Sequence, residues 1–247
     1  MKQWFDSKKV FIDKMGGLIY EVPQTVNFEL SEREKTKKVN NFIEYVEDVY
    51  KLYDLAHFLR VERAGFFSNT VIQEYYLSST EIIPRGMKLV KAFKNFIEDS
   101  NNLNLIQSEA SRIIQENKIE GTLCFSVHPL DFLSLSENSC NWRSCHALDG
   151  DYRSGNLSYM CDTSTIICYL KSKTDNNDSI LPSFPSDVKW NSKKWRILFF
   201  TNENRSCIFA GRQYPFTCEN SLNIVSKYID KPFDIDFNFD WSYWHND

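Results

Sequence analysis

The hydrophobic pattern of this 247-residue chain changes its period near the middle. Between residues 31 and 116 apolar side chains recur at three and four positions, whereas from Thr122 onward they tend to alternate with polar ones. The first spacing places one stripe of a helix against a core, and alternation does the same for one face of a strand. The chain is therefore predicted to be an α+β protein, with a helical N-terminal half packed against a mainly antiparallel β-sheet in the C-terminal half.

Nothing in the sequence resembles an interdomain linker. A single domain covering 1–247 is predicted, with a mainly helical part at 28–120 and a β-rich part at 121–247. A compact chain of this length buries a sizeable core without the help of disulfides or metals.

Helix boundaries are marked most clearly at Ser31, which forms a capping-box pattern with Glu34. The apolar spacing that follows predicts a helix over 31–58. Further helices are predicted at 70–78, 86–98 and 104–116, and Gly121 ends this pattern.

Strands are predicted where β-favouring residues alternate in the second half, at 123–127, 165–170, 195–201 and 207–211. Pro129 favours a short helix to about residue 135, and 221–228 is predicted to be another. An antiparallel meander is the simplest arrangement. The tail from Phe233 alternates aromatic and acidic residues, which is typical of a terminal strand or of an acidic, aromatic docking segment.

The charge balance excludes one class of function. With 29 basic against 33 acidic residues the net charge is −4, so no global basic field exists to bind nucleic acid, and any phosphate-binding surface must be local. Charges interrupt the first twenty residues, and no run approaches the length of a membrane span. We therefore expect a cytoplasmic protein of the host cell with no membrane partner, whose seven cysteines are thiols.

The segment from Cys140 to Gly155 is unusually rich in reactive side chains. Cys145 is a candidate nucleophile if a base lowers the pKa of its thiol, and the candidate bases are His146, His128 and His57. Adjacent His146 is an awkward base because neighbours on a strand point to opposite faces. The alternative is an inert cysteine in a core.

A zinc site is a second reading of the same segment. Its ligands would be Cys140, Cys145 and His146 with Cys161 or Cys168, but no second cysteine pair follows, so no metal is expected. No glycine-rich phosphate loop, H-E-x-x-H or G-x-S-x-G motif occurs, and no cofactor is expected either.

Arginine recognition of an anion is the third reading. Residues 186–213 hold six basic and two acidic side chains, which makes a local patch of +4 on an acidic protein. The planar guanidinium fork donates two parallel hydrogen bonds to a phosphate, and a tyrosine can stack on a base. Arg205 is a further arginine of the patch. The alternative is a set of solvated arginines paired with surface carboxylates. The predicted ligand-binding residues are Arg143, Ser144, Arg153, Arg196, Arg212, Gln213 and Tyr214.

These motifs also carry a resemblance. The order His128-Pro129-Leu130-Asp131, then Asn141-Trp142-Arg143-Ser144-Cys145-His146, then Gly211-Arg212-Gln213-Tyr214-Pro215, is similar to a group of uncharacterised phage and mobile-element proteins of Firmicutes. It covers roughly residues 122–216, and in layout the segment distantly resembles the PcfJ-like proteins of conjugative elements. The resemblance implies a phage or mobile-element accessory protein that acts on host machinery or host defence. It implies no catalytic residues.

Three functions follow as expectations. The first is a non-enzymatic binding protein that holds a nucleotide, a nucleic acid or a host target, such as a component of host defence, through the arginines of the β-rich half. The second is an enzyme with Cys145 as its nucleophile. The third is a protein inhibitor of a host factor that acts through the helices or the acidic aromatic tail.

Overall fold

The chain divides into two compact units in the computed structural model. The sheet unit comprises Met1–Phe28 and Ile119–Asp247, and the helical unit comprises Glu29–Lys118. Each is described by itself. The residues that the structure describes are 2–136, 142–147, 150–171, 179–180, 189–190, 193–201 and 208–233.

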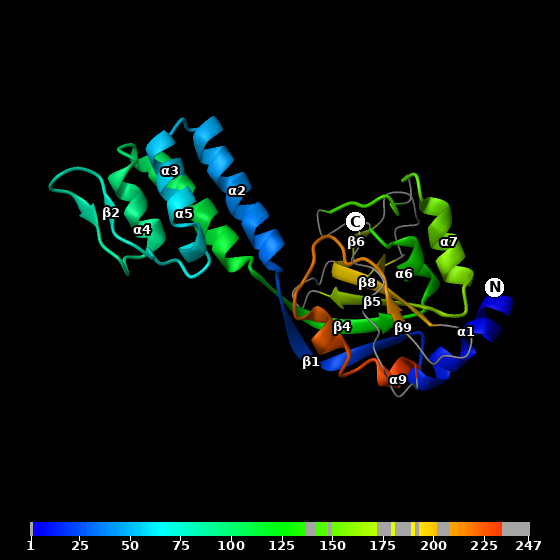
Figure 1. Cartoon of the computed structure of the whole chain (residues 1–247). Helices are drawn as coiled ribbons and strands as arrows, with labels where there is room; N and C mark the ends of the chain where they lie inside the picture. The colour runs from blue at the N-terminus through cyan, green and yellow to red at the C-terminus, as the bar shows by residue number, and fades with distance from the viewer. Residues whose placement is uncertain are drawn as a thin grey trace. The chain divides into compact units, whose positions relative to one another are not determined.

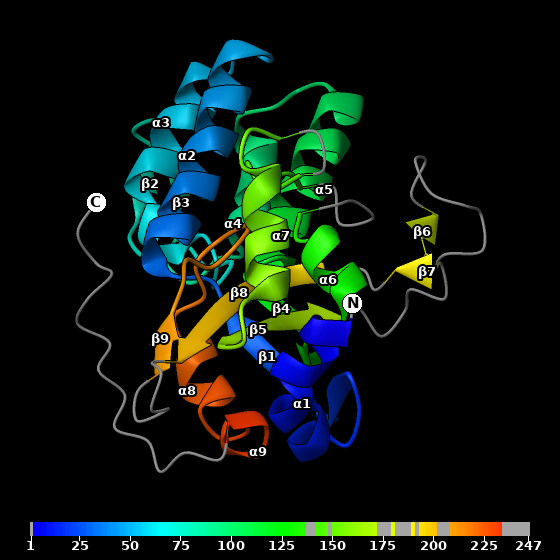
Figure 2. The same cartoon turned by 90° about the vertical axis from the view of Figure 1, so that its right-hand side faces the viewer.

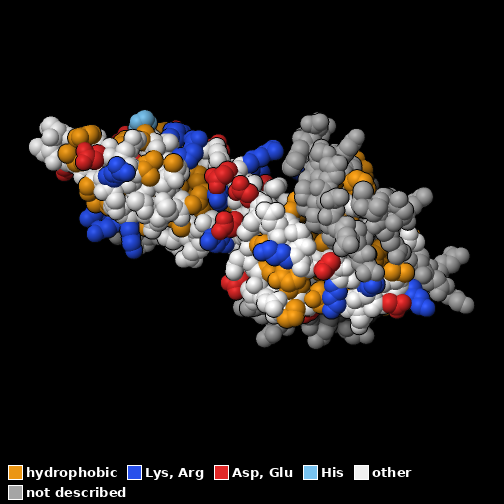
Figure 3. All heavy atoms as spheres, turned by 60° about the horizontal axis from the view of Figure 1, so that its bottom comes forward, with side chains coloured by type: hydrophobic (Ala, Val, Ile, Leu, Met, Phe, Trp, Pro, Cys, Tyr) orange, Lys and Arg blue, Asp and Glu red, His pale blue; other side chains and the backbone are white. Residues whose placement is uncertain are grey.

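The helical unit is built around three longer helices (Figure 1). They are α2 (Glu32–Asp48), α3 (Tyr53–Val61) and α5 (Ser100–Gln115), joined by the short helix α4 (Leu89–Ala92), the 3₁₀ turns η1 (Arg63–Gly65) and η2 (Phe93–Asn95), and the hairpin β2 (Tyr75–Tyr76) and β3 (Ile82–Ile83). Their apolar faces share one core, which contains Val39, Phe42, Leu55, Phe58 and Ile106. Side chains of both charges cover the solvent face of this unit (Figure 3).

The predicted helix over 31–58 begins where expected, because the Ser31 hydroxyl accepts a hydrogen bond from the Glu34 amide. The predicted length of this helix was wrong. Helix α2 ends at Asp48, and Lys51 adopts a left-handed φ of 56°, which stops a helix and turns the chain into α3. The apolar stripe also leaves the core here, since Val49 is 61% exposed.

The other helix predictions in this unit had mixed outcomes. The helix at 104–116 is confirmed as α5, which Asp99 caps through the Asn102 amide. The prediction of a helix at 70–78 was wrong. That stretch contains strand β2, whose two tyrosines favour a hairpin. The helix at 86–98 is shorter than predicted, being reduced to α4 and η2.

The sheet unit contains a five-stranded sheet in the order β1-β4-β5-β8-β9. The strands are β1 (Ile19–Glu29), β4 (Lys118–Ser126), β5 (Thr165–Lys171), β8 (Lys193–Thr201) and β9 (Ile208–Ala210), and a separate hairpin pairs β6 (Ser179–Ile180) with β7 (Lys189–Trp190). The pairs β4–β5, β5–β8 and β8–β9 are antiparallel, as the predicted meander requires. The α+β class is confirmed, with helices mainly in the N-terminal half of the chain and strands in the C-terminal half.

Helices lie on both faces of the sheet (Figure 2). Helices α6 (Pro129–Leu133) and α7 (Arg153–Cys161) lie on one face, and α8 (Ser221–Val225) and α9 (Asp230–Phe233) lie on the other. Helix α1 (Lys2–Met15) contacts both α7 and α9. Because both faces are covered, consecutive residues of β5 and β8 are buried whichever way they point.

Strand β1 was not predicted, although the predicted strands and the short helix after Pro129 are confirmed. Pro23 lies inside β1, and a proline argues against a strand except at an edge, which is where β1 lies. The predicted helix at 221–228 is confirmed as the shorter α8. The tail beyond residue 233 lies outside the described residues.

Candidate functional site

The loop at 142–147 is held against the edge of β8 in the sheet unit. The Trp142 indole donates to the backbone oxygen of Lys193 at 2.7 Å, and the Ser144 hydroxyl lies 3.5 Å from a terminal nitrogen of Arg196. Gly150 lets the chain return tightly, because a Cβ there would lie 2.4 Å from the carbonyl oxygen of Cys145. The loop therefore lies directly beside Arg196.

Arg196 is the most unusual residue of this site. Its position in β8 aligns it with Tyr169 of β5, and its side chain is only 1% exposed. Its Nε donates to the Leu135 carbonyl at 2.7 Å. Burial lowers the pKa of Arg196 to about 10, so the guanidinium stays charged at neutral pH.

No carboxylate of the described residues forms an ion pair with Arg196. Its guanidinium carbon instead lies 4.4 Å from the ring centroid of Tyr214 and 5.9 Å from that of Trp142. Cation–π contacts offset part of the cost of burying the charge. A buried charge is ordinarily paired with an opposite one, so Arg196 marks a place where an anion would be stabilised.

Arg212 lies next to Arg196 across the same tyrosine. Its guanidinium carbon is 5.3 Å from the Tyr214 ring centroid, and the residue is exposed. Tyr214 is held firmly in place, because its backbone exchanges two hydrogen bonds with Arg196 at 2.8 and 3.0 Å. The structure therefore brings Arg196, Arg212 and Tyr214 together with Trp142 and Ser144; we call these five residues the arginine site.

The other predicted ligand residues are placed less centrally. Arg143 is exposed and lies between Trp142 and Ser144 in the chain. Arg153 is exposed at the start of α7, and no described contact joins its side chain to the arginine site. Arg205 lies outside the described residues.

Gln213 points its amide into the structural core of the sheet unit. Its Oε1 accepts hydrogen bonds from the Trp195 indole at 3.0 Å, the Cys218 amide at 2.7 Å and the Ser221 hydroxyl at 3.1 Å. These bonds use up the acceptor capacity of the oxygen, so Gln213 supports the fold rather than a ligand.

His146 is oriented by a residue that the sequence did not single out. Its Nδ1 lies 3.0 Å from Oδ1 of the buried Asn156, whose amide nitrogen donates to the His146 carbonyl at 2.7 Å. Since the amide nitrogen is used there, Oδ1 is the acceptor and Nδ1 carries the proton. Burial, and then the charge of Arg196, lower the pKa of His146, which favours the neutral imidazole.

The remaining catalytic candidates differ in their surroundings. Cys145 is exposed and precedes His146 directly. His128 caps α6, because its Nδ1 accepts a hydrogen bond from the Leu130 amide at 3.2 Å. His57 belongs to the helical unit, where its ring lies 6.3 Å from that of Tyr75.

The described residues contain no group of three or more potential metal ligands. Cys161 is exposed on α7, whereas Cys168 is fully buried in β5 and its thiol pKa is raised by burial. Cys140 lies outside the described residues. Among the described residues, Cys124, Cys145, Cys161, Cys168 and Cys218 are not joined in disulfides.

A buried polar network lies beside the arginine site and was missed by the sequence analysis. The Lys193 ammonium lies 2.7 Å from a carboxylate oxygen of Asp131, and both side chains are at most 5% exposed. Ser126 donates to the other Asp131 oxygen at 2.5 Å, and Lys193 also contacts the Ser134 hydroxyl at 2.9 Å. This network fixes α6 to β8. It therefore also fixes the position of the Leu135 carbonyl, which accepts the hydrogen bond of Arg196.

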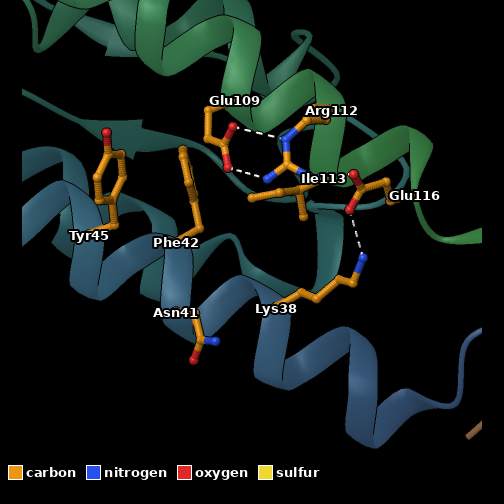
Figure 4. Close-up of a pocket in the computed structure, with 8 residues that line it drawn as sticks. All are labelled: Lys38, Asn41, Phe42, Tyr45, Glu109, Arg112, Ile113 and Glu116. Atoms are coloured by element: carbon orange, nitrogen blue, oxygen red, sulfur yellow. Dashed lines mark hydrogen bonds and ion pairs between the residues drawn. The ribbon is translucent and has the colours of Figure 1, made fainter. Parts of the chain in front are cut away.

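A groove of about 460 Å³ lies in the helical unit between α2 and α5 (Figure 4). Arg112 is paired with Glu109 and Glu116, and Lys38 contacts Glu116 at 2.8 Å. The hydrogen bond from Arg112 lowers the pKa of the Glu109 carboxyl. Because these charges are satisfied by one another, the groove offers no excess charge to a ligand. It contains none of the predicted site residues.

Among the described residues, no helix has the length and apolar character needed to cross a bilayer. Comparison with protein-family models, with curated proteins and with solved structures gives no match to this chain.

Proposed function

We propose that the chain is a non-enzymatic accessory protein, of phage or mobile-element type, that binds a phosphate-bearing ligand such as a nucleotide at the arginine site. The observation that carries the proposal is the buried guanidinium of Arg196, which has no carboxylate partner among the described residues and shares the Tyr214 ring with the exposed Arg212. A bound anion would compensate two neighbouring positive charges at once.

A nucleotide suits this site better than a small carboxylate does. Each guanidinium can donate two parallel hydrogen bonds to a phosphate group. The rings of Trp142 and Tyr214 are nearly parallel, with 17° between their planes, and supply aromatic surface for a base. A nucleotide would use both features, and inorganic pyrophosphate only the first.

Replacing Arg143 and Arg212 together by alanine should weaken ligand binding at least about tenfold, because the site loses the charge-assisted hydrogen bonds of Arg212 and the adjoining loop loses the positive charge of Arg143. Titration calorimetry with ATP and with pyrophosphate measures the loss. Both residues are exposed, so the melting temperature should change little. Arg153→Ala should have a smaller effect on affinity, because no described contact places it at the site.

The matched control is Arg33→Ala with Arg63→Ala, which removes the same charge from exposed positions of the helical unit. That pair should bind like the wild type. Wild-type affinity should also fall as salt is added. An affinity that does not change with salt, or an equal loss in both double variants, contradicts the proposal.

An enzyme with Cys145 as nucleophile is the second candidate, and the orientation of His146 by Asn156 favours it. A nucleophilic Cys145 should react with iodoacetamide faster than an exposed cysteine that has no base beside it. Cys161 is the internal control, since it is exposed as well. If peptide mapping finds Cys145 labelled at least about tenfold faster than Cys161 at pH 6.5, catalysis is favoured; equal rates remove this candidate.

A further inference from the structure

Four exposed basic residues follow one another at intervals of three along the helical unit: Arg85, Lys88, Lys91 and Lys94. We call them the basic stripe. No acidic residue occurs between residues 82 and 97. Among the described residues none of the four forms an ion pair, in contrast to Arg112 and Lys38 in the groove of the same unit. The stripe is therefore a local excess of positive charge.

The fold keeps the stripe on one face. Lys91 lies in α4 and Lys94 in η2, where residues three apart are neighbours in an α-helix and eclipse one another in a 3₁₀-helix, and Lys88 is the N-cap residue of α4. The opposite face consists of Leu89, Ala92 and Phe93, which are fully buried in the core of the unit. This burial prevents the segment from rotating, so the three ammonium groups stay in a row facing solvent.

An exposed aromatic ring lies close to the start of the stripe. Tyr76 is 66% exposed, and it pairs across the β2–β3 hairpin with Ile82, which is 48% exposed. Strand β3 leads through Pro84 directly into Arg85. In Figure 3 basic, acidic and hydrophobic side chains are all exposed at the left-hand end of the helical unit.

We propose that the basic stripe and Tyr76 bind single-stranded nucleic acid. Proteins that bind single strands without sequence preference combine a row of cations along the backbone with aromatic rings on which bases stack. A regular row of cations fits the evenly charged phosphate backbone, and an exposed tyrosine offers a ring on which a base can stack. This site lies in the helical unit and shares no residue with the arginine site, so it goes beyond the proposed function.

The test uses the full chain and a fluorescein-labelled oligothymidylate strand, with binding followed by anisotropy over a range of salt concentrations. Each phosphate contact on a single strand contributes about −0.7 to the slope of log K against log salt. Replacing Lys88, Lys91 and Lys94 by glutamine should therefore make the slope shallower by about 2 and lower the affinity at least about tenfold. Tyr76→Ala should lower the affinity about fivefold or more by removing stacking.

Each control removes the same number of positive charges, or the same aromatic ring, at positions outside the proposed binding surface. Arg33, Lys37 and Lys227, all exposed, are replaced by glutamine in the first control, and the exposed Tyr53 is replaced by alanine in the second. Both should bind the strand like the wild type. The inference is overturned if the stripe variant keeps the wild-type slope, or if polyglutamate displaces the strand as well as unlabelled oligothymidylate does. Loss of strand binding only in the Arg143 and Arg212 variant would overturn it too, while leaving the arginine site supported.

Discussion

Asp131→Ala should lower the free energy of unfolding of the sheet unit by about 3–5 kcal/mol, because it removes one partner of a buried ion pair. The Lys193 ammonium, 1% exposed, would lose the carboxylate that now lies 2.7 Å away. The Ser126 hydroxyl would lose its acceptor as well. Only part of this loss can be relieved by the Ser134 hydroxyl and the Tyr169 ring, which lie 2.9 Å and 4.8 Å from the ammonium.

Urea unfolding followed by tryptophan fluorescence measures this loss in the intact chain. All six tryptophans belong to the sheet unit, so the signal reports on that unit alone. The control is Glu21→Ala, which removes a more exposed pair with Lys171 and should cost at most about 1 kcal/mol. Asp131→Leu combined with Lys193→Met should recover most of the stability. Equal losses in Asp131→Ala and Glu21→Ala would contradict the role of the buried network.

This network illustrates why part of the site could not be predicted from the sequence. Asp131 and Lys193 are 62 positions apart, and neither belongs to a motif that names its partner. A signal for burial was nevertheless present. The run from Trp195 to Phe200 is apolar on both faces apart from Arg196, which indicates a strand covered on both sides and hence a buried guanidinium.

The fold was predictable where local patterns agree with tertiary packing. Helix α5 has a consistent apolar stripe and a capping Asp99, and strand β5 has an apolar run bounded by polar segments. The prediction was wrong where the stripe continued past the core, at Val49, and where the β-favouring Tyr75 and Tyr76 were assigned to a helix. Periodicity records which residues are apolar, but the path of the chain decides which of them are buried.

The second large expected effect is a pH-dependent free energy of unfolding, which arises from Lys8. This lysine of α1 is fully buried, and its ammonium donates to the Thr165 carbonyl at 2.5 Å and lies 4.6 Å from the Phe132 ring. Burial lowers its pKa from 10.5 to about 7, and Asp162 and Cys161 offset only part of that shift. The folded state therefore binds fewer protons at Lys8 than the unfolded state does between pH 7 and about 10.5.

Stability contributed by Lys8 should consequently rise with pH across this window, by about 2 kcal/mol between pH 7 and 9. Lys8→Met removes the titrating group, so the stability of the variant minus that of the wild type should fall by the same amount over the same range. Taking the difference cancels the buried thiols of Cys124 and Cys168, whose raised pKa values lower stability as the pH rises above the unfolded thiol pKa.

The same urea unfolding, repeated at pH 7, 8 and 9, measures that difference. The neighbouring Lys9 is exposed and provides the matched control, because Lys9→Met should parallel the wild type at every pH. The shifted pKa of His146 does not interfere, since His146 is neutral in both the folded and the unfolded state over most of this range. If Lys8→Met also parallels the wild type, Lys8 keeps its proton in the folded protein, and the buried carbonyl, ring and Asp162 stabilise a charged ammonium.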